Sequence, residues 1–262
     1  MTLANLLRPD SGLRVLVTAG AGGIGRRIVE GYREVGARIA VCDVSDDALS
    51  AFRSEIPDAL AVKCDVADRE AVADMVRQAR EALGGFDVVV NNAGISGPTG
   101  TVEDLDPVEW ERTLRTDLDS QFYIAHETAR DLKESRGSLI NIASVAGRLG
   151  YAYRTPYASA KWGIVGFTKS LAAEMGPDGV RVNAILPGIV EGERIRGVIS
   201  ARAQALGVSY EEMEKRYLAN VSLRRMVSAD DVATTCLFLT SPGGANISGQ
   251  AISVCGNVEV LM

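Results

Sequence analysis

The feature that most constrains the fold is a cluster of glycines between a strand-like and a helical segment near the start of the chain. Residues 13–18, Leu-Arg-Val-Leu-Val-Thr, are short and β-branched, as in a buried strand. The glycine cluster then ends at Gly25, and a helical pattern runs from Arg26 to Val35. Strand, glycine-rich turn and helix in this order direct backbone N–H groups toward a phosphate. The segment therefore predicts a phosphate-binding turn, with an ordinary tight turn as the alternative.

Strand-like and helical segments alternate along the rest of the chain. Apolar segments typical of buried strands lie at residues 38–42, 59–64, 86–90, 138–143, 180–186 and 250–255. Helical patterns lie at residues 68–83, 107–134, from about 156, and 229–239, with Asp106, Thr155 and Ser228 as expected N-caps. This alternation predicts an α/β protein: a doubly wound parallel sheet of about seven strands, flanked by helices, in a single domain over residues 1–262.

The segment 189–225 departs from this alternation. It is charged, helical in places, and interrupted by Gly192, Gly197 and Gly207, which we expect to be breaks. We expect an excursion that covers a site as a substrate lid. An inert, solvated surface insertion is the alternative.

The composition argues against several classes of partner and site. A net charge of −6 argues against nucleic acid or a membrane surface. No apolar run reaches the ~18 residues of a membrane span, and the start lacks a signal-peptide pattern. The scattered Cys42, Cys64, Cys236 and Cys255 suggest reduced thiols in a cytoplasmic protein. His126 is the only histidine, which argues against a metal site or a Ser-His-Asp triad.

An acidic residue ends the second predicted strand. Asp43 lies about 20 residues past the glycines, where a dinucleotide-binding fold bonds the ribose hydroxyls of the adenosine. A carboxylate there would repel a 2′-phosphate, and Val44 and Ser45 supply no arginine to accept one. The position therefore favours NAD over NADP. The alternative is that Asp43 or Ser45 caps the following helix.

A tyrosine and a lysine lie one helical turn apart after the strand at 138–143. Tyr157 and Lys161 have i, i+4 spacing, which places a phenol and an ammonium on one helix face. A phenol has an unperturbed pKa of about 10, and an ammonium within ~4–6 Å favours the phenolate. Ser144 ends the strand, where its hydroxyl can hydrogen-bond a carbonyl oxygen held beside the tyrosine. These three residues predict an acid/base site; the alternative is capping and packing of a helix.

Two amides and a glycine follow the fourth predicted strand, as Asn91-Asn-Ala-Gly94. The carboxyl ends of strands in an open parallel sheet form the crevice where ligands bind. Asp65 and Val66 close the third strand at the same edge. We therefore expect both segments to contribute to one ligand site.

These residues together resemble the short-chain dehydrogenase/reductase family in its compact, single-domain form. The motifs occur in the family's order, over residues 13 to about 258: Thr18-x-Gly-x-x-Gly-Ile-Gly25, Asp65, Asn91-Asn-Ala-Gly94, Ser144, Tyr157-x-x-x-Lys161 and Pro187-Gly188. The resemblance implies a Rossmann-type fold, a nicotinamide cofactor, and hydride transfer between a carbinol and a carbonyl. Family members are commonly tetramers or dimers, which implies a homotetramer or homodimer.

The resemblance also implies roles for individual residues. Tyr157 is the implied general acid/base, Lys161 favours its phenolate and holds the nicotinamide ribose, and Ser144 orients the substrate oxygen. The implied cofactor contacts are Gly20, Gly22, Gly23, Ile24, Gly25, Asp43, Asp65, Val66, Asn91, Ala93, Gly94, Tyr157, Lys161, Pro187, Gly188 and Ile189.

Three positions depart from the family pattern. Ala19 replaces a glycine in the first motif, and we expect an unchanged cofactor site. Asp117 falls where the family has an asparagine on a helix, whose water links the lysine to solvent. We expect Asp117 to act as the catalytic proton-relay residue, because a carboxylate can hold a water molecule as the asparagine does. Ile189 replaces a threonine after Pro-Gly, and we expect it to take over the contact with the carboxamide.

Arginines and tyrosines around the expected site suggest a substrate class. The candidate substrate residues are Ser96, Arg148, Tyr151, Arg154 and Arg194. In an acidic protein, arginines at the mouth suggest a small, polar, anionic substrate, with solvated surface arginines as the alternative. The leading hypothesis is an NAD-dependent dehydrogenase for a secondary alcohol. The alternatives are an NADPH-linked 3-oxoacyl-type ketoreductase and a non-catalytic NAD-binding sensor.

Overall fold

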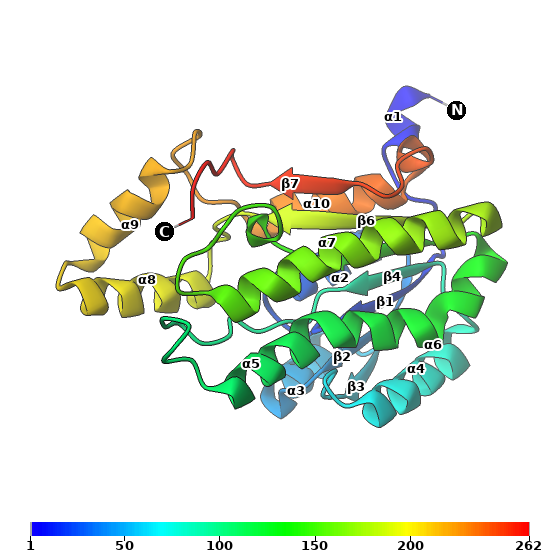
Figure 1. Ribbon diagram of the computed structural model, residues 1–262. Coiled ribbons are helices and arrows are strands. Elements are labelled where there is room, and N and C mark those ends of the chain that lie inside the picture. Colours follow the sequence, from blue (N-terminus) through cyan, green and yellow to red (C-terminus); the bar gives the residue numbers. More distant parts are fainter. Residues whose placement is uncertain (1, 262) are drawn as a thin grey trace.

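Seven strands form one parallel sheet in the computed structural model, which describes residues 2–261 apart from the side chain of residue 205 (Figure 1). The strands are β1 (Arg14–Thr18), β2 (Arg38–Asp43), β3 (Leu60–Lys63), β4 (Val88–Asn91), β5 (Ser138–Ile142), β6 (Arg181–Pro187) and β7 (Ala251–Val254). Their order is β3-β2-β1-β4-β5-β6-β7, and every neighbouring pair is parallel. The predicted seven-stranded, doubly wound α/β sheet is confirmed.

Helices cover both faces of this sheet. The helices along the described chain are α1 (Leu3–Leu6), α2 (Gly23–Glu34), α3 (Asp46–Glu55), α4 (Arg69–Leu83), α5 (Pro107–Leu114), α6 (Ser120–Ser135), α7 (Thr155–Met175), α8 (Glu193–Leu206), α9 (Tyr210–Ala219) and α10 (Ala229–Thr240). Helices α4, α6 and α7 pack on one face, and α2, α3 and α10 on the other. No helix in the described part of the chain has the length and apolar character that a bilayer crossing requires.

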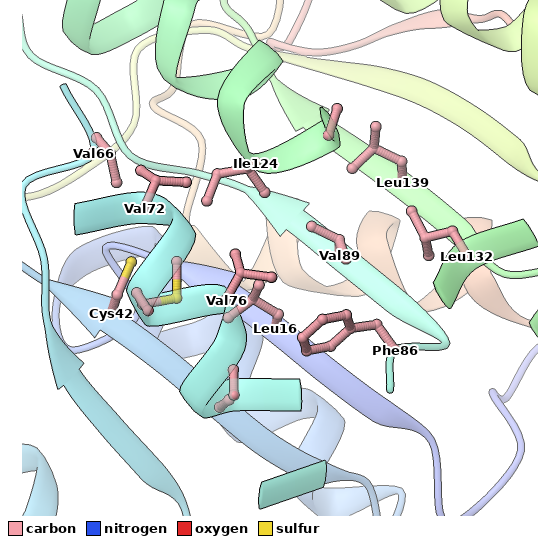
Figure 2. Packing of buried hydrophobic residues seen from close by; sticks show 14 of the residues in the cluster. Leu16, Cys42, Val66, Val72, Val76, Phe86, Val89, Ile124, Leu132 and Leu139 are labelled. Atoms are coloured by element: carbon pink, nitrogen blue, oxygen red, sulfur yellow. The ribbon is translucent and has the colours of Figure 1, made fainter. Parts of the chain in front are cut away.

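Alternate side chains of each strand supply two separate cores. Leu16 of β1 and Val89 of β4 meet Val72 and Val76 of α4 on one face, where Ile124 of α6 closes the cluster (Figure 2). The intervening strand residues pack against α2 and α10 on the opposite face. Because both faces are buried, the strands are apolar along their whole length rather than alternating with polar residues.

The chain changes direction across the sheet between β1 and β4. From β1 it proceeds through β2 to β3 on one side, and then returns to β4 on the other side. In an open α/β sheet this reversal leaves a crevice at the carboxyl ends of the two diverging strands. The glycine-rich turn after β1 and the loop after β4 therefore border the same crevice.

A bidentate ion pair joins β1 to β4 at the amino ends of these strands, opposite the crevice. The Arg14 guanidinium donates to both Asp87 carboxylate oxygens, with Nη2–Oδ1 and Nε–Oδ2 distances of 2.8 and 2.9 Å. Burial raises the pKa of Asp87, but the hydrogen bonds and charge of Arg14 outweigh it and hold that pKa below its ordinary value. The carboxylate thus stays ionised and pins the register of the two central strands.

Segment 189–225 forms a helical hairpin, α8 and α9, beyond the carboxyl ends of the strands (Figure 1). Its apolar residues, including Ile199 and Met213, pack with Val145, which directly follows Ser144. Gly192 precedes α8 and Gly207 ends it, as expected of breaks, but Gly197 lies inside α8. The prediction that Gly197 interrupts the helix is wrong, because packing of the hairpin outweighs the weak helix propensity of one glycine.

One helix prediction needs correction and another gains a detail. Thr155 does not cap α7: Arg154 is the N-cap residue, and Thr155 and Pro156 lie in the first turn. The long helix predicted at 107–134 is confirmed as an unbroken helical segment, but it contains a π-helical turn, Arg115–Asp119, between α5 and α6. Such a turn inserts one residue into the helical repeat and redirects the side chains that it carries. It carries Asp117, and no proline or glycine signals it in the sequence.

Candidate active site

The turn after β1 is tied directly to the loop after β4. The Thr18 hydroxyl oxygen accepts hydrogen bonds from the backbone N–H groups of Asn92 and Ala93, at 2.9 and 3.0 Å. In return, the Asn92 side-chain amide donates to the backbone carbonyls of Thr18 and Ala19, at 3.0 and 3.1 Å. The two predicted cofactor segments therefore form one rigid unit. The sequence motif included Thr18 and Asn92 but did not reveal this contact between them.

The glycines of the turn divide into two groups. A Cβ on Gly20 would lie 2.6 Å from a side-chain carbon of β2, and one on Gly25 would lie 2.2 Å from the carbonyl oxygen of Ala19. These two glycines allow close packing. Among the described residues, nothing lies within 4 Å of a Cβ built on Gly22 or Gly23, and no side chain caps the N-terminus of α2. The free N–H groups of that helix face open space, an arrangement that fits the pyrophosphate of a dinucleotide.

The acidic residues after β2 and β3 lie at the same edge of the sheet. One Asp43 carboxylate oxygen accepts from the backbone N–H of Ser45 at 3.1 Å, and Ser45 is the residue that caps α3. An Asp65 oxygen similarly accepts from the N–H of Ala67 at 2.9 Å. The Val66 side chain is buried in the core, and a contact of Val66 with a cofactor stays a prediction. Both carboxylates are held in fixed turns beside the glycine segment.

Ser144 and the Tyr157–Lys161 pair come together through close backbone packing. The short 3₁₀ turn Val145–Gly147 rests on α7, where a Cβ on Gly147 would lie only 2.6 Å from the Lys161 carbonyl oxygen. The Ser144 hydroxyl begins this turn and accepts from the Ala146 N–H at 3.1 Å. On α7, the Lys161 ammonium nitrogen lies 5.4 Å from the centroid of the Tyr157 ring. The structure thus places the ammonium against the phenol, as the spacing predicts.

A buried carboxylate faces the same ammonium. Asp117 Oδ2 lies 3.2 Å from Lys161 Nζ, and the two side chains are 0% and 5% exposed. The other oxygen, Oδ1, accepts from the backbone N–H of Ile95 at 2.7 Å. A Cβ on Gly94 would lie 3.2 and 3.3 Å from these two charged groups, so this glycine leaves room for the ion pair. Asp117 therefore binds both Lys161 and the loop that follows β4.

A buried amide chain beneath the site was not predicted. The Asn91 side chain donates to Asn141 Oδ1 at 2.9 Å, and Asn141 donates to the Thr168 hydroxyl at 2.9 Å. These bonds join β4, β5 and α7 below the reacting groups. The sequence indicates this connection only through Asn141, which is a polar residue inside the mainly apolar strand 138–143. A buried amide of this kind needs partners, so it marks a structural connection.

The segment after β6 leads into the α8–α9 hairpin. The Gly188 N–H donates to the Val254 carbonyl at 2.9 Å, and a Cβ on Gly188 would lie 2.8 Å from Cys255 Cα. The Ile189 carbonyl accepts from the Val227 N–H at 2.8 Å, while its side chain packs with the apolar residues of the hairpin. The contacts of Pro187, Gly188 and Ile189 with a cofactor stay a prediction.

Two of the candidate substrate arginines contact different parts of the chain. Arg194, in the first turn of α8, donates to the Gly94 carbonyl at 2.6 Å and so joins the α8–α9 hairpin to the loop after β4. Arg148 donates to the Ser253 hydroxyl of β7 at 2.8 Å. No contact joins Arg148 to the Tyr157–Lys161 pair among the described residues, and its role toward a substrate stays a prediction.

Arg154 lies directly beside the predicted acid/base. Its guanidinium carbon is 5.3 Å from the centroid of the Tyr157 ring and 5.2 Å from that of Tyr151. Nη2 donates to the Ser96 carbonyl at 2.5 Å. Burial, and then the neighbouring Tyr217, raise the pKa of Tyr151, so its phenol stays protonated despite the nearby cation. Three of the candidate substrate residues, Ser96, Tyr151 and Arg154, thus form one cluster with Tyr157.

The fold and this site define a class of protein. A glycine turn at the reversal point of a doubly wound sheet, beside a tyrosine–lysine pair, is the arrangement of a Rossmann-type oxidoreductase. The family model described as Enoyl-(Acyl carrier protein) reductase matches residues 19–257. The chain belongs to the short-chain dehydrogenase/reductase family. In the described part of the chain, no group of three or more His, Cys, Asp or Glu side chains is placed to hold a metal ion.

Known relatives cover nearly the whole chain. A probable galactose dehydrogenase of Rhizobium meliloti is 34% identical, over 98% of this chain and 100% of the relative. An actinorhodin polyketide ketoreductase solved with NADPH is 33% identical, with a TM-score of 0.89 over 94% of this chain and 96% of that one. A xylitol dehydrogenase solved with NAD⁺ is 25% identical, with a TM-score of 0.88 over 94% and 98%. The family therefore uses nicotinamide cofactors of both kinds.

Removal of the Asp117 carboxylate is predicted to destabilise the fold. In Asp117→Ala the buried Lys161 ammonium loses its counter-charge, and we expect the free energy of unfolding to fall by about 3–5 kcal/mol. Asp117→Asn keeps an oxygen acceptor for the Ile95 N–H, and its loss is expected to be less than half of that. Urea unfolding of the ligand-free protein measures both values.

The matched control is Asp119→Ala, in the same π-helical turn but without an ion pair among the described residues. We expect its unfolding free energy to change by less than about 0.5 kcal/mol. An alanine variant at position 117 as stable as the control would show that the pair with Lys161 contributes nothing to the fold.

Proposed function

We propose that this protein is an NAD-dependent dehydrogenase that transfers a hydride between a small secondary alcohol, or its ketone, and the nicotinamide. The observation that carries the proposal is the Lys161 ammonium 5.4 Å from the ring of Tyr157, at the edge of the sheet where the cofactor turn lies. A phenol held beside an ammonium is suited to exchange a proton near neutral pH. A protein that only binds a dinucleotide does not need such a phenol.

The proposed reaction assigns one task to each side chain. During alcohol oxidation the Tyr157 phenolate takes the hydroxyl proton while the carbinol C–H leaves as a hydride, which yields a ketone. The bound nicotinamide supplies the hydride acceptor in this direction and the hydride donor in the reverse direction. Ser144 orients the substrate oxygen toward Tyr157. Lys161 stabilises the phenolate and holds the nicotinamide ribose, and Asp117 connects that lysine to a proton relay.

The proposed preference for NAD depends on Asp43. Its carboxylate is fixed at the end of β2 by the Ser45 N–H, where it would accept the ribose hydroxyls and repel a 2′-phosphate. The alternative, an NADPH-linked 3-oxoacyl-type ketoreductase, draws support from the similarity to the ketoreductase solved with NADPH. The two proposals differ in whether the Asp43 carboxylate repels the 2′-phosphate of NADPH.

Titration with NADH and NADPH is expected to show at least about tenfold tighter binding of NADH, corresponding to about 1.4 kcal/mol. The Asp43→Ser variant should lose most of this difference, because the repulsion of the 2′-phosphate is removed. The control is Asp47→Ser, which makes the same change of charge at an exposed position on α3 and should keep the preference. Tighter binding of NADPH by the wild type would favour the ketoreductase.

Removal of the Tyr157 hydroxyl is predicted to abolish chemistry but not binding. For Tyr157→Phe, we expect kcat on a panel of polar secondary alcohols to fall by about 10²–10⁴-fold. The Kd for NADH should stay close to the wild-type value. Tyr153→Phe removes a hydroxyl from an exposed tyrosine in the same segment and should keep its activity. Wild-type protein that binds NADH but turns over no alcohol or ketone would instead support a non-catalytic sensor.

We further propose a homodimer or homotetramer of this chain in the cytoplasm. Helices α6 and α7 expose an aromatic face, with Phe122 and Trp162 each 52% exposed and the Phe122 and Phe167 rings 6.5 Å apart. Such a face favours a protein partner. Light scattering is expected to give a dimer or tetramer mass, and Trp162→Glu a smaller one. A monomeric wild type would refute the assembly, and native protein found outside the cytoplasm would refute the location.

A further inference from the structure

We infer that Arg154 is the specificity-determining residue of the site and that the substrate carries a carboxylate, which binds this guanidinium. The inference depends on the proposed hydride transfer at Tyr157, and names the substrate class on which that reaction acts. Arg154 is one of several arginines in the predicted substrate region. Its burial and its lack of a carboxylate partner among the described residues single it out for this role.

Arg154 is a buried cation without a counter-ion. Only 6% of the residue is exposed, yet within the described residues no carboxylate oxygen lies within 4.0 Å of it. Its Nε is buried and has no hydrogen-bond partner, while Nη2 is bound to a neutral carbonyl, that of Ser96. By contrast, the partly buried Arg14 and Arg26 are each paired with carboxylates. Arg154 therefore has charge and hydrogen-bonding capacity that the protein leaves unmatched.

An unmatched buried charge is costly for a folded protein. Burial of an ion without an opposite charge is unfavourable, and the loss is recovered only through pairing. The rings of Tyr151 and Tyr157 offset part of this cost, since a cation over an aromatic face is attracted to the ring. An anionic ligand would offset much more. A guanidinium held ready in a fixed position is also suited to a planar carboxylate.

The position of Arg154 relates this anion site to the reacting atoms. Its guanidinium carbon lies 5.3 Å from the ring centroid of the same Tyr157 that exchanges the proton. Because the guanidinium lies against the ring of Tyr157, we expect one small molecule to reach both groups, with its carboxylate on Arg154 and its reacting oxygen at the Tyr157 hydroxyl. A small hydroxy acid or keto acid fits this expectation. The lid lies over the same segment, because the Arg202 guanidinium carbon is 5.3 Å from the Tyr153 ring centroid.

Arg154 also has a structural contact, which gives the competing explanation. Its bond to the Ser96 carbonyl joins residues 94–100 to residues 151–157, and the Gly100 N–H donates to the Tyr153 carbonyl at 3.0 Å beside it. If Arg154 only holds these loops together, its loss will affect every substrate equally. If it binds a carboxylate, its loss will affect only substrates that have one.

The test compares two ketones that differ in a single charge, acetoacetate and its methyl ester, in steady-state reduction with NADH. In the wild type, kcat/KM for the acid should exceed that for the ester. In Arg154→Met, kcat/KM for the acid should fall by roughly 10- to 100-fold, as expected for loss of a charge-assisted hydrogen bond. The value for the ester should fall by a much smaller factor, so the preference for the acid disappears.

Two further variants keep the comparison interpretable. Arg154→Lys retains the charge without the planar fork, and it should retain part of the preference for the acid. Arg112→Met makes the same change of net charge at an exposed position on α5 and should keep the full preference. Thermal unfolding should show Arg154→Met to be at least as stable as the wild type, because the variant removes an uncompensated buried charge.

Three results would overturn the inference. They are a wild type that prefers the ester, an equal loss on both ketones in Arg154→Met, or an equal loss of preference in Arg112→Met. If neither ketone is reduced although NADH binds, the proposed reaction fails for these compounds, and binding of malonate to the NADH complex decides the inference separately. Saturable binding that weakens at least tenfold in Arg154→Met supports it, and binding that is absent or unchanged in the variant overturns it.

Discussion

A parallel sheet covered by helices on both faces leaves only its strand ends for polar chemistry. In this protein the central strands are buried on both faces, and polar residues Thr18, Asn91 and Ser144 lie at or just after the carboxyl ends of β1, β4 and β5. The reversal between β1 and β4 opens that edge, and the bonds of Thr18 and Asn92 hold it in shape. The glycine turn, the Tyr157–Lys161 pair and the α8–α9 hairpin all depend on this single constraint.

The charges around Tyr157 follow an unusual arrangement. The Lys161 ammonium, which supports the phenolate in the proposed reaction, is itself paired with the buried Asp117. Arg154 lies against the ring of the same tyrosine, and no carboxylate of the described residues pairs with it. Within that part of the chain, the tyrosine ring therefore has one cation that is paired and one that is not. A substrate carboxylate would neutralise the second, so that substrate binding and the charge balance of the site are coupled in the proposed reaction.

Asp117, which replaces the asparagine of the family pattern, fits into the structure because of two backbone features. A π-helical turn rotates Asp117 toward Lys161 and the Ile95 N–H, and Gly94 leaves space for the pair. The Asp117 carboxylate is thus fully buried and bound on both of its oxygens, and does not lie at the protein surface. Its oxygen also binds the loop that follows β4, so any change at this position acts on the lysine and on the cofactor loop together.

Local patterns in the sequence determined the parts of the structure that depend on near neighbours. The strands, the glycine turn and the capping residue Ser228 follow from apolar periodicity and side-chain chemistry within a few residues. The pairing of Tyr157 with Lys161 follows from i, i+4 spacing on one helix. Motif order was sufficient for the family because each motif occupies a fixed place in the alternation of strands and helices.

Only the tertiary structure decided the contacts between distant segments. The partner of Lys161 is Asp117, on another helix, and the π-helical turn that presents it has no local sequence signal. Arg148 and Arg154 look equivalent in sequence, yet one contacts β7 and the other is buried beside Tyr157. Such contacts depend on how the strands are ordered and how the loops pack above them, and neither is encoded in the spacing of nearby residues.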